Sequence, residues 1–206
     1  MTNDKTKIDE KRQLKRDRIK DYFLNAAKEI IIEDGVESIT VRSVADRAGY
    51  SYATLYNYFE DLNSLLWHTK LSLINDVFAW MKEAVADVPI DIDGLKRTYE
   101  IYMSYYFDHP NAFKFFYNHR IAAPDLQSSP YEVDFDKAMR ETFKSLVLAC
   151  KLREEDVPLA YRLFVYVVHG LLTLHFSGNT DSTLQTAVGE MNMMVDFIFN
   201  RKADEK

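Results

Sequence analysis

The sequence predicts an all-α fold of about nine helices, in which a three-helix N-terminal unit precedes a larger helical bundle. Apolar residues recur at helical spacing along most of the 206 residues, and no segment alternates convincingly as a strand would. The breaks are short and rich in Pro, Gly, Asp and Ser, as in "DVPIDIDG" and "SGNTDS". We place the boundary between two domains after residue 61, giving 1–61 and 62–206 without a flexible linker.

Three helices are expected in the N-terminal part. The first runs from Asp17 towards Gly35, and its apolar side contains Ile19, Tyr22, Phe23, Ala26, Ala27 and Ile30. Thr40 is a favourable N-cap for a second helix, which Gly49 ends. Ser51 then caps a third helix.

Six further helices are expected in the bundle, over residues 62–86, 93–108, 110–120, 132–151, 154–177 and 181–200. Residues 157–176 are apolar over a length that could cross a bilayer. They include Arg162, His169 and His175, whose ionisable side chains are costly in lipid. We therefore interpret this helix as buried on several sides in a soluble bundle or in an interface.

Cysteine usage and the N-terminus indicate the compartment. The single cysteine, Cys150, excludes a disulfide framework and favours a reducing environment. The first twenty residues lack the apolar core of a secretory signal. A cytoplasmic location is expected.

The charge is unevenly distributed. The whole chain carries a net charge of −6, yet residues 5–20 carry +5 and residues 71–206 carry −6. This asymmetry indicates a basic N-terminal segment joined to an acidic body, which suits an anionic partner bound at one end.

Residues 40–61, "TVRSVADRAGYSYATLYNYFED", have the spacing of a helix-turn-helix. The "AGYS" turn joins two short helices, of which the second would enter the major groove of DNA. Hydroxyl groups such as that of Tyr56 can bond phosphate oxygens, and the small side chain of Ala53 permits close approach to base edges. The alternative interpretation is a structural helical hairpin with surface tyrosines.

The longer stretch "DGVESITVRSVADRAGYSYATLYNYFEDLNSLL", residues 34–66, resembles the DNA-binding domain of the tetracycline-repressor (TetR) family. Members typically show "T-x-x-x-I-A-x-x-A-G" followed by "S-x-x-T-L-Y-x-Y-F". The matching residues here are Thr40, Val44, Ala45, Ala48, Gly49, Ser51, Thr54, Leu55, Tyr56, Tyr58, Phe59 and Leu65. The close match covers about fifty residues; the rest agrees only in length and helical pattern.

The resemblance and the hydroxyl chemistry together nominate a DNA-binding set: Thr40, Arg42, Ser51, Tyr52, Ala53, Thr54, Tyr56, Asn57 and Tyr58. One departure is Leu62, where family members commonly carry a basic residue that meets a phosphate. Losing one such phosphate contact reduces the slope of log K against log salt concentration by roughly one. Lys15, Arg16 and Arg18 could compensate by following the DNA backbone or entering the minor groove.

The resemblance also implies a ligand pocket within the C-terminal helices. Nine Tyr and Phe residues lie between positions 99 and 117, more than a plain core needs. The candidate ligand residues are Tyr102, Tyr106, Phe113, Phe116, Tyr117, Phe143, Phe164 and His169; ordinary core packing remains the alternative for each. No histidine pair has the i, i+4 spacing of a metal site, so neither metal nor cofactor is expected.

The last two helices are predicted to form a homodimer, as the resemblance also implies. The candidate interface residues are Tyr166, Leu172, Leu184, Val188, Met191 and Val195. Two helices from each subunit would make a four-helix interface, and its two-fold symmetry would suit a palindromic operator in double-stranded DNA.

The function expected is that of a ligand-responsive transcriptional regulator, most simply a repressor released by a small apolar or aromatic molecule. The alternative is a DNA-binding protein of the same fold with a structural role and no inducer. An enzyme is not expected, because the sequence contains no phosphate loop, nucleophile elbow or metal-ligand cluster.

Overall fold

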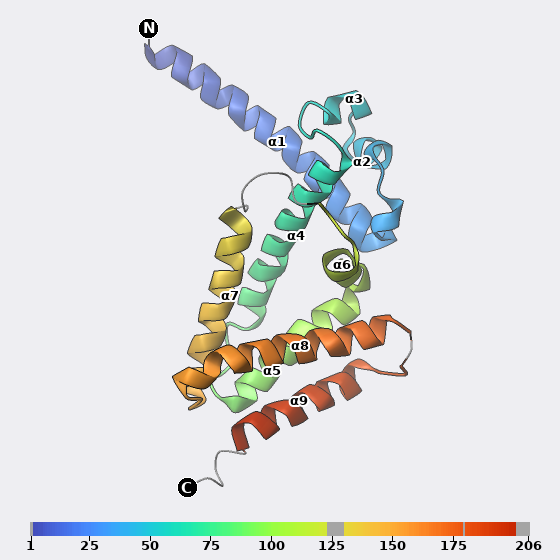
Figure 1. Cartoon of the computed structure of the whole chain (residues 1–206). Helices are drawn as coiled ribbons and strands as arrows, with labels where there is room; N and C mark the ends of the chain where they lie inside the picture. The colour runs from blue at the N-terminus through green and yellow to red at the C-terminus, as the bar shows by residue number, and fades with distance from the viewer. Residues whose placement is uncertain (1, 123–129, 179, 201–206) are drawn as a thin grey trace. The chain divides into compact units, whose positions relative to one another are not determined.

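The computed structural model describes residues 2–122, 130–178 and 180–200, with side chains described for all of these except 2–9, 130–136, 138 and 200. Regular structure within these ranges is entirely helical (Figure 1). The α-helices are α1 (Thr2–Asp34), α2 (Val41–Ala48), α3 (Tyr52–Leu55), α4 (Leu62–Ala84), α5 (Ile92–Asp108), α6 (Pro110–Phe113), α7 (Pro130–Ala149), α8 (Val157–Phe176) and α9 (Leu184–Asn200). Single turns of other helix types occur at Val36–Ser38, Lys114–Asn118 and Glu154–Asp156. The all-α prediction is confirmed.

The chain forms two compact units. The first contains Met1–Asp76 and Asn111–Leu126, and the second contains Val77–Pro110 and Gln127–Lys206. Helix α4 contributes to both units. These units are defined by packing, so the functional boundary expected after residue 61 stays a prediction.

The first unit is organised around one apolar core. The fully buried side chains of Phe23, Ile31, Val44, Leu55 and Leu65 bring α1, α2, α3 and the start of α4 together. The connecting segments are fixed by hydrogen bonds, because Asn63 donates to the carbonyl of Ala122 and accepts from its amide, at 2.8 and 3.1 Å. The core therefore holds α2, α3 and the start of α4 at fixed places on α1.

Side-chain caps define the helix-turn-helix. The Thr40 hydroxyl accepts from the Ser43 amide at 2.9 Å while the Ser43 hydroxyl accepts from the Thr40 amide, forming a reciprocal capping box. Gly49 ends α2 with φ 75° and ψ 28°, a left-handed conformation that favours glycine. Ser51 accepts from the Thr54 amide at 3.1 Å and so begins α3. The predicted helix caps Thr40, Gly49 and Ser51 are therefore confirmed.

The expected start of the first helix is wrong. Helix α1 begins at Thr2 rather than near Asp17 and therefore includes the basic segment. No glycine or proline occurs between residues 2 and 34, and Gln13 donates to Asp17 one turn later at 2.8 Å, so nothing interrupts the helix. Lys15, Arg16 and Arg18 therefore lie on a helix rather than on an extended arm, and their contact with DNA stays a prediction.

Helix α5 is the centre of the second unit. It packs against α9 and α8, and α7 packs against α8 on another side (Figure 1). Leu95, Met103, Phe164, Leu172 and Val195 are fully buried between these helices. An ion pair of 2.6 Å between Lys96 and Asp196 joins α5 to α9 at the edge of this core. Helices α8 and α9 thus each use one face for the core of their own subunit.

Candidate DNA-binding surface and ligand site

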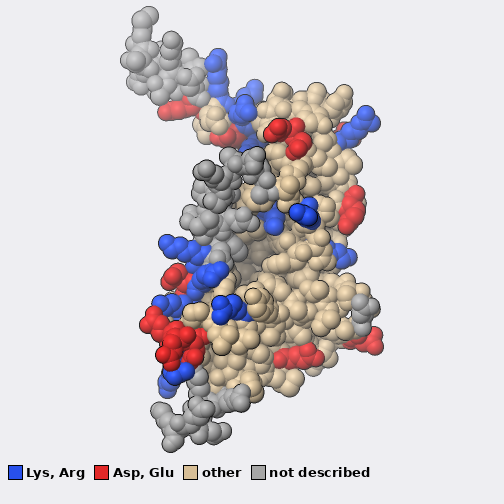
Figure 2. Space-filling view, in the orientation of Figure 1, with Lys and Arg blue, Asp and Glu red and all other residues tan. Residues whose placement is uncertain are grey.

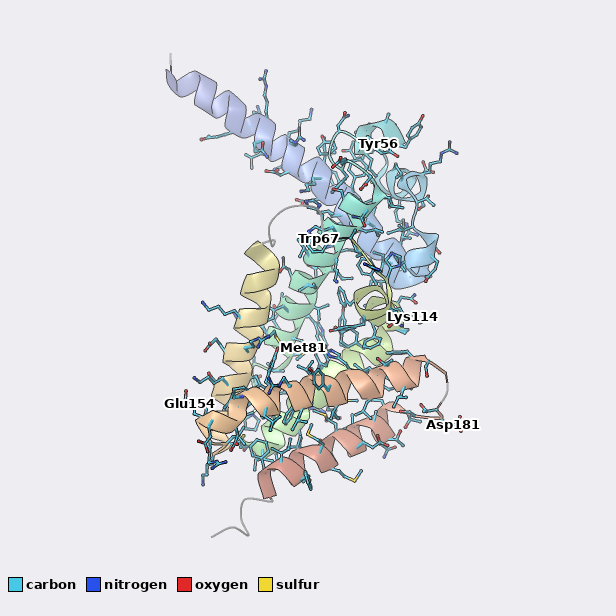
Figure 3. All side chains as sticks on the ribbon, viewed as in Figure 1. Tyr56, Trp67, Met81, Lys114, Glu154 and Asp181 are labelled. Carbon is cyan, nitrogen blue, oxygen red and sulfur yellow. The ribbon has the colours of Figure 1, made fainter. Side chains whose placement is uncertain are left out.

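The surface of α3 is rich in exposed polar and aromatic side chains. Tyr52, Ala53, Tyr56 and Asn57 are all exposed, and 51% of the Tyr56 side chain surface is accessible. Figure 3 labels Tyr56, which follows α3 directly. Leu55 is fully buried beneath them. The segment therefore has a core side and an outer side.

The remaining candidates on the helix-turn-helix have structural roles as well. Thr40 and Ser51 are helix caps, and the Thr54 hydroxyl lies 2.9 Å from that of Ser51. The Arg42 guanidinium of α2 lies 5.9 Å from the ring centroid of Tyr52 on α3. This cation–π contact joins the two helices at their exposed side and places a positive charge beside the tyrosine hydroxyls.

Two basic residues of α1 contact the segment after α3. Arg16 lies over the ring of Tyr58 at 5.4 Å, and Lys20, one turn further on, lies over the ring of Phe59 at 5.7 Å. Lys15 and Arg18 are exposed and point elsewhere on the helix, because residues one and two positions apart do not share a face. In Figure 2 Lys and Arg side chains gather along the described part of α1.

Leu62, the departure from the family pattern, is half-buried against the core of the first unit. Asp61 precedes it and caps α4 by accepting from the Ser64 amide at 2.7 Å. The start of α4 therefore carries a carboxylate and an apolar side chain at the place where a cation would bind a DNA phosphate. The positive charge of this unit near the helix-turn-helix comes instead from α1 and Arg42.

The predicted ligand residues fall into both compact units. Phe113, Phe116 and Tyr117 belong to the first unit, where Phe113 is fully buried and Tyr117 is exposed with its ring 4.8 Å from that of Phe113. Tyr102, Tyr106, Phe143, Phe164 and His169 belong to the second unit. Sequence spacing alone could not make this division, which depends on how the segment after α5 returns to the first unit.

In the second unit one group of candidate ligand residues joins α5 to α8, and another joins α7 to α8. The Tyr102 hydroxyl and His169 Nε2 are hydrogen-bonded at 2.9 Å, with Tyr106 5.1 Å from Tyr102 between ring centroids. Phe143 and Phe164 meet edge to face at 5.2 Å. Burial lowers the pKa of His169 below its ordinary value, partly offset by a hydrogen bond with the Val165 backbone. The neutral imidazole is thus the favoured form here.

A groove lies between α7 and α8, with a volume of about 580 Å³. Of the predicted ligand residues it includes Phe143, and Tyr166 from the predicted dimer set also lines it. Its cations are Arg140, Lys144 and Arg162, none of which was predicted from the sequence to contact a ligand. Helical spacing could have placed them beside Phe143 and Tyr166 on their helices, but not across from one another.

The predicted dimer residues divide into buried and exposed sets. Leu172, Met191 and Val195 are buried in the core of the second unit, Leu184 and Val188 are half-buried, and Tyr166 is 68% exposed. Met191 and Val195 lie on α9, which packs chiefly against α5, and Leu172 lies on α8, which packs against both helices. The exposed apolar side chains of these helices are instead Leu159, Leu163, Tyr166, Leu174, Met193 and Phe197.

The exposed residues form a continuous stripe on each helix. Leu159, Leu163, Tyr166 and Leu174 recur at spacings of three, four and eight along α8, and Met193 and Phe197 are four apart on α9. Few charged side chains occur over α8 and α9 on the face seen in Figure 2. The segment Glu154–Phe176 is long and apolar enough to cross a membrane, by length and composition alone. Surface of this kind commonly marks a protein–protein contact.

Comparisons with known proteins agree with this architecture. Residues 23–66 match the family model of the bacterial regulatory proteins, tetR family. A search of curated proteins gives no significant match. Solved structures share the fold: a TetR transcriptional regulator from Rhodococcus sp. RHA1 is 20% identical, with 88% of this chain and 96% of that chain covered and a TM-score of 0.60.

Two other similar structures contain ligands. The transcriptional regulator FadR from Bacillus subtilis, in complex with stearoyl-CoA, is 16% identical over 84% of this chain and 96% of that chain, with a TM-score of 0.65. RolR in complex with resorcinol is 16% identical over 88% of this chain and 89% of that chain, with a TM-score of 0.63.

The capped α2–α3 pair, with its exposed hydroxyl groups and flanking cations, makes the first unit a helix-turn-helix DNA-binding domain. Residues 23–66 match the TetR family model, and solved TetR regulators share the fold over most of this chain, so the first unit is a TetR-type DNA-binding domain within a TetR-like fold.

Proposed function

We propose that the protein is a dimeric repressor that binds a palindromic operator and is released by a small apolar or aromatic effector. The observation that carries the DNA-binding part is the exposed outer side of α3, with Tyr52, Tyr56 and Asn57 above the buried Leu55. Arg42, Lys15 and Arg18 supply exposed positive charge near it in sequence and on the same unit. Phosphate contacts from these groups would fix the register, while Ala53 approaches the bases.

The dimer is assigned to the exposed stripes of α8 and α9 rather than to the full predicted set. Tyr166 stays in the interface, joined by Leu163 and Phe197, while Met191 and Val195 serve the subunit core. Gly170 and Gly189 are exposed with open space at the place of a Cβ, so a partner helix could approach both backbones closely. A two-fold dimer would present two recognition helices to half-sites one helical turn, ~34–36 Å, apart or a near multiple.

The effector is assigned to the aromatic region of the second unit. The Tyr102–His169 hydrogen bond places polar groups within apolar surroundings, a combination found in the lining of small-molecule pockets. FadR and RolR, which share the fold, were solved in complex with stearoyl-CoA and with resorcinol, and both of these ligands are organic molecules. Catalysis is not part of the proposal, and a soluble cytoplasmic location fits a DNA-binding regulator.

Regulation would follow from linkage. An effector lowers DNA affinity if it binds more tightly to a conformer whose recognition helices are not positioned for the operator. Because the coupling is reciprocal, bound DNA lowers the affinity for the effector by the same factor. Helix α4 runs without interruption from the first unit into the second and is the element proposed to convey the change.

The decisive experiment is DNA binding by the full-length protein. Fluorescence anisotropy with a duplex from the promoter region beside its own gene, at low ionic strength, should give saturable binding that an unrelated duplex of equal length does not match. Equal binding to both duplexes, or binding to neither, would refute sequence-specific regulation. A Tyr52→Ala, Tyr56→Ala double variant is the matched control, because both side chains are exposed and their removal leaves the core intact.

A further inference from the structure

The groove between α7 and α8 has a size and lining suited to a small organic molecule. Its volume of about 580 Å³ falls within the range of roughly 300–1,000 Å³ that is common for ligand sites. Phe143, Tyr161 and Val165 supply its apolar surface. Phe143 is buried and meets both Tyr161 and Phe164 edge to face, at 5.3 and 5.2 Å between ring centroids. The apolar side of the groove is therefore anchored in the core of the second unit.

The polar lining of the groove is mainly cationic. Arg140, Lys144 and Arg162 line it together with one carboxylate, that of Glu141. Lys144 is already engaged, because its ammonium lies 2.6 Å from Glu154, whose charge raises the lysine pKa. Glu154 lies in the turn between α7 and α8, as Figure 3 shows. Arg162 is the cation of this lining that the proposal uses for a ligand.

The two arginines differ in their surroundings. The Arg140 guanidinium lies 5.1 Å from the ring centroid of Tyr161 and so covers part of the aromatic surface. Arg162 is exposed on α8 and makes no ion pair with any side chain that the structure describes. A guanidinium presents paired N–H donors that match the two oxygens of a carboxylate.

We propose that this groove binds a small amphipathic carboxylate, with the anionic group on Arg162 and the apolar body against Phe143 and Tyr161. The inference rests on the proposed function in one respect: it keeps the apolar body proposed for the effector, placed against Phe143, and adds an anionic group that Arg162 would bind. Binding itself can be measured without DNA, so the two proposals fail separately.

The test is isothermal titration of the full-length protein with decanoate and with decan-1-ol, which has the same chain length and no charge. Decanoate should bind saturably and more tightly than decanol. Arg162→Gln should weaken decanoate binding about tenfold, as expected for losing a charge-assisted hydrogen bond, and leave decanol unchanged. Arg162→Lys should restore part of the loss. Arg97→Gln is the matched control, because Arg97 is an exposed arginine of the same unit, on α5, paired with Glu100.

The inference is overturned if decanol binds as tightly as decanoate, or if Arg162→Gln and Arg97→Gln behave alike. Loss of decanoate binding with intact DNA binding would reject the groove and leave the regulator proposal standing. Decanoate binding without any specific DNA binding would reject the regulator and leave the groove.

Discussion

The guanidinium of Arg16 donates a hydrogen bond to the carbonyl oxygen of Asn57, 3.1 Å away and 41 positions later in the chain. The same side chain lies over the ring of Tyr58. Arg16 was predicted to contact DNA, but these contacts occupy it within the protein. We expect Arg16 to hold the residues that follow α3 against α1. Arg16 would then affect DNA binding through Asn57 and Tyr58.

Arg16→Ala should therefore weaken operator binding without changing its salt dependence. Loss of one hydrogen bond and one cation–π contact should cost about 1 kcal/mol, or about fivefold in affinity. Arg18→Ala is the comparison, because Arg18 is exposed and a phosphate contact from it would lower the slope of log K against log salt by about 0.9. Anisotropy titrations at several salt concentrations measure both quantities. A smaller slope for Arg16→Ala would assign Arg16 to phosphate instead.

Tyr56→Phe removes only a hydroxyl group from an exposed ring. If that hydroxyl bonds a phosphate, affinity should fall by about 1 kcal/mol on every operator sequence, because phosphate contacts carry no base information. The melting temperature should not change. A loss that depends on the operator sequence would place Tyr56 against a base edge.

Tyr166→Glu and Phe197→Glu place charges on the exposed stripes of α8 and α9 and should each convert a dimer into a folded monomer. Sedimentation velocity at micromolar concentration measures the change, and circular dichroism verifies the fold. Met191→Ala is the contrasting variant, because Met191 is 1% exposed in the subunit core and should instead lose about 2–5 kcal/mol of unfolding free energy. Dimers that survive both charged variants would place the interface elsewhere.

His169 should make the protein less stable in acid. Burial depresses its folded-state pKa below the ordinary value of 6.5 that applies after unfolding. Between these two values the unfolded chain binds the extra proton, so this stability is present above pH 6.5 and is lost as the pH falls through the folded-state pKa. Urea unfolding at pH 7.5 and 5.5 should show a smaller acid-dependent loss for His169→Gln than for the natural protein. Equal losses would mean that His169 does not contribute.

The N-terminal unit was predictable because its signals are local. Thr40, Gly49 and Ser51 act on atoms within a few residues of themselves, so spacing and residue type were sufficient to place α2 and α3. The start of α1 was missed because apolar periodicity begins only at Asp17, while the basic segment before it is helical without an apolar face.

The second unit shows where local patterns stop being informative. Helix α8 is apolar on most sides, so its sequence does not distinguish Leu172, which is buried, from Leu174, which is exposed. That distinction depends on where α5 and α9 lie. The same limit applies to the groove, whose cations come from two helices more than ten residues apart in sequence.

The brevity of α3 constrains how such a protein can tell one site from another. A single helical turn between Ser51 and Tyr56 presents only a few side chains, so one copy can inspect only a short run of base pairs. In the proposed dimer, discrimination would come from the same contacts made by the second subunit and from the ease with which the flanking DNA bends or its minor groove narrows. The operator of the proposed dimer would accordingly be defined as much by the spacing of its two half-sites as by their base sequence.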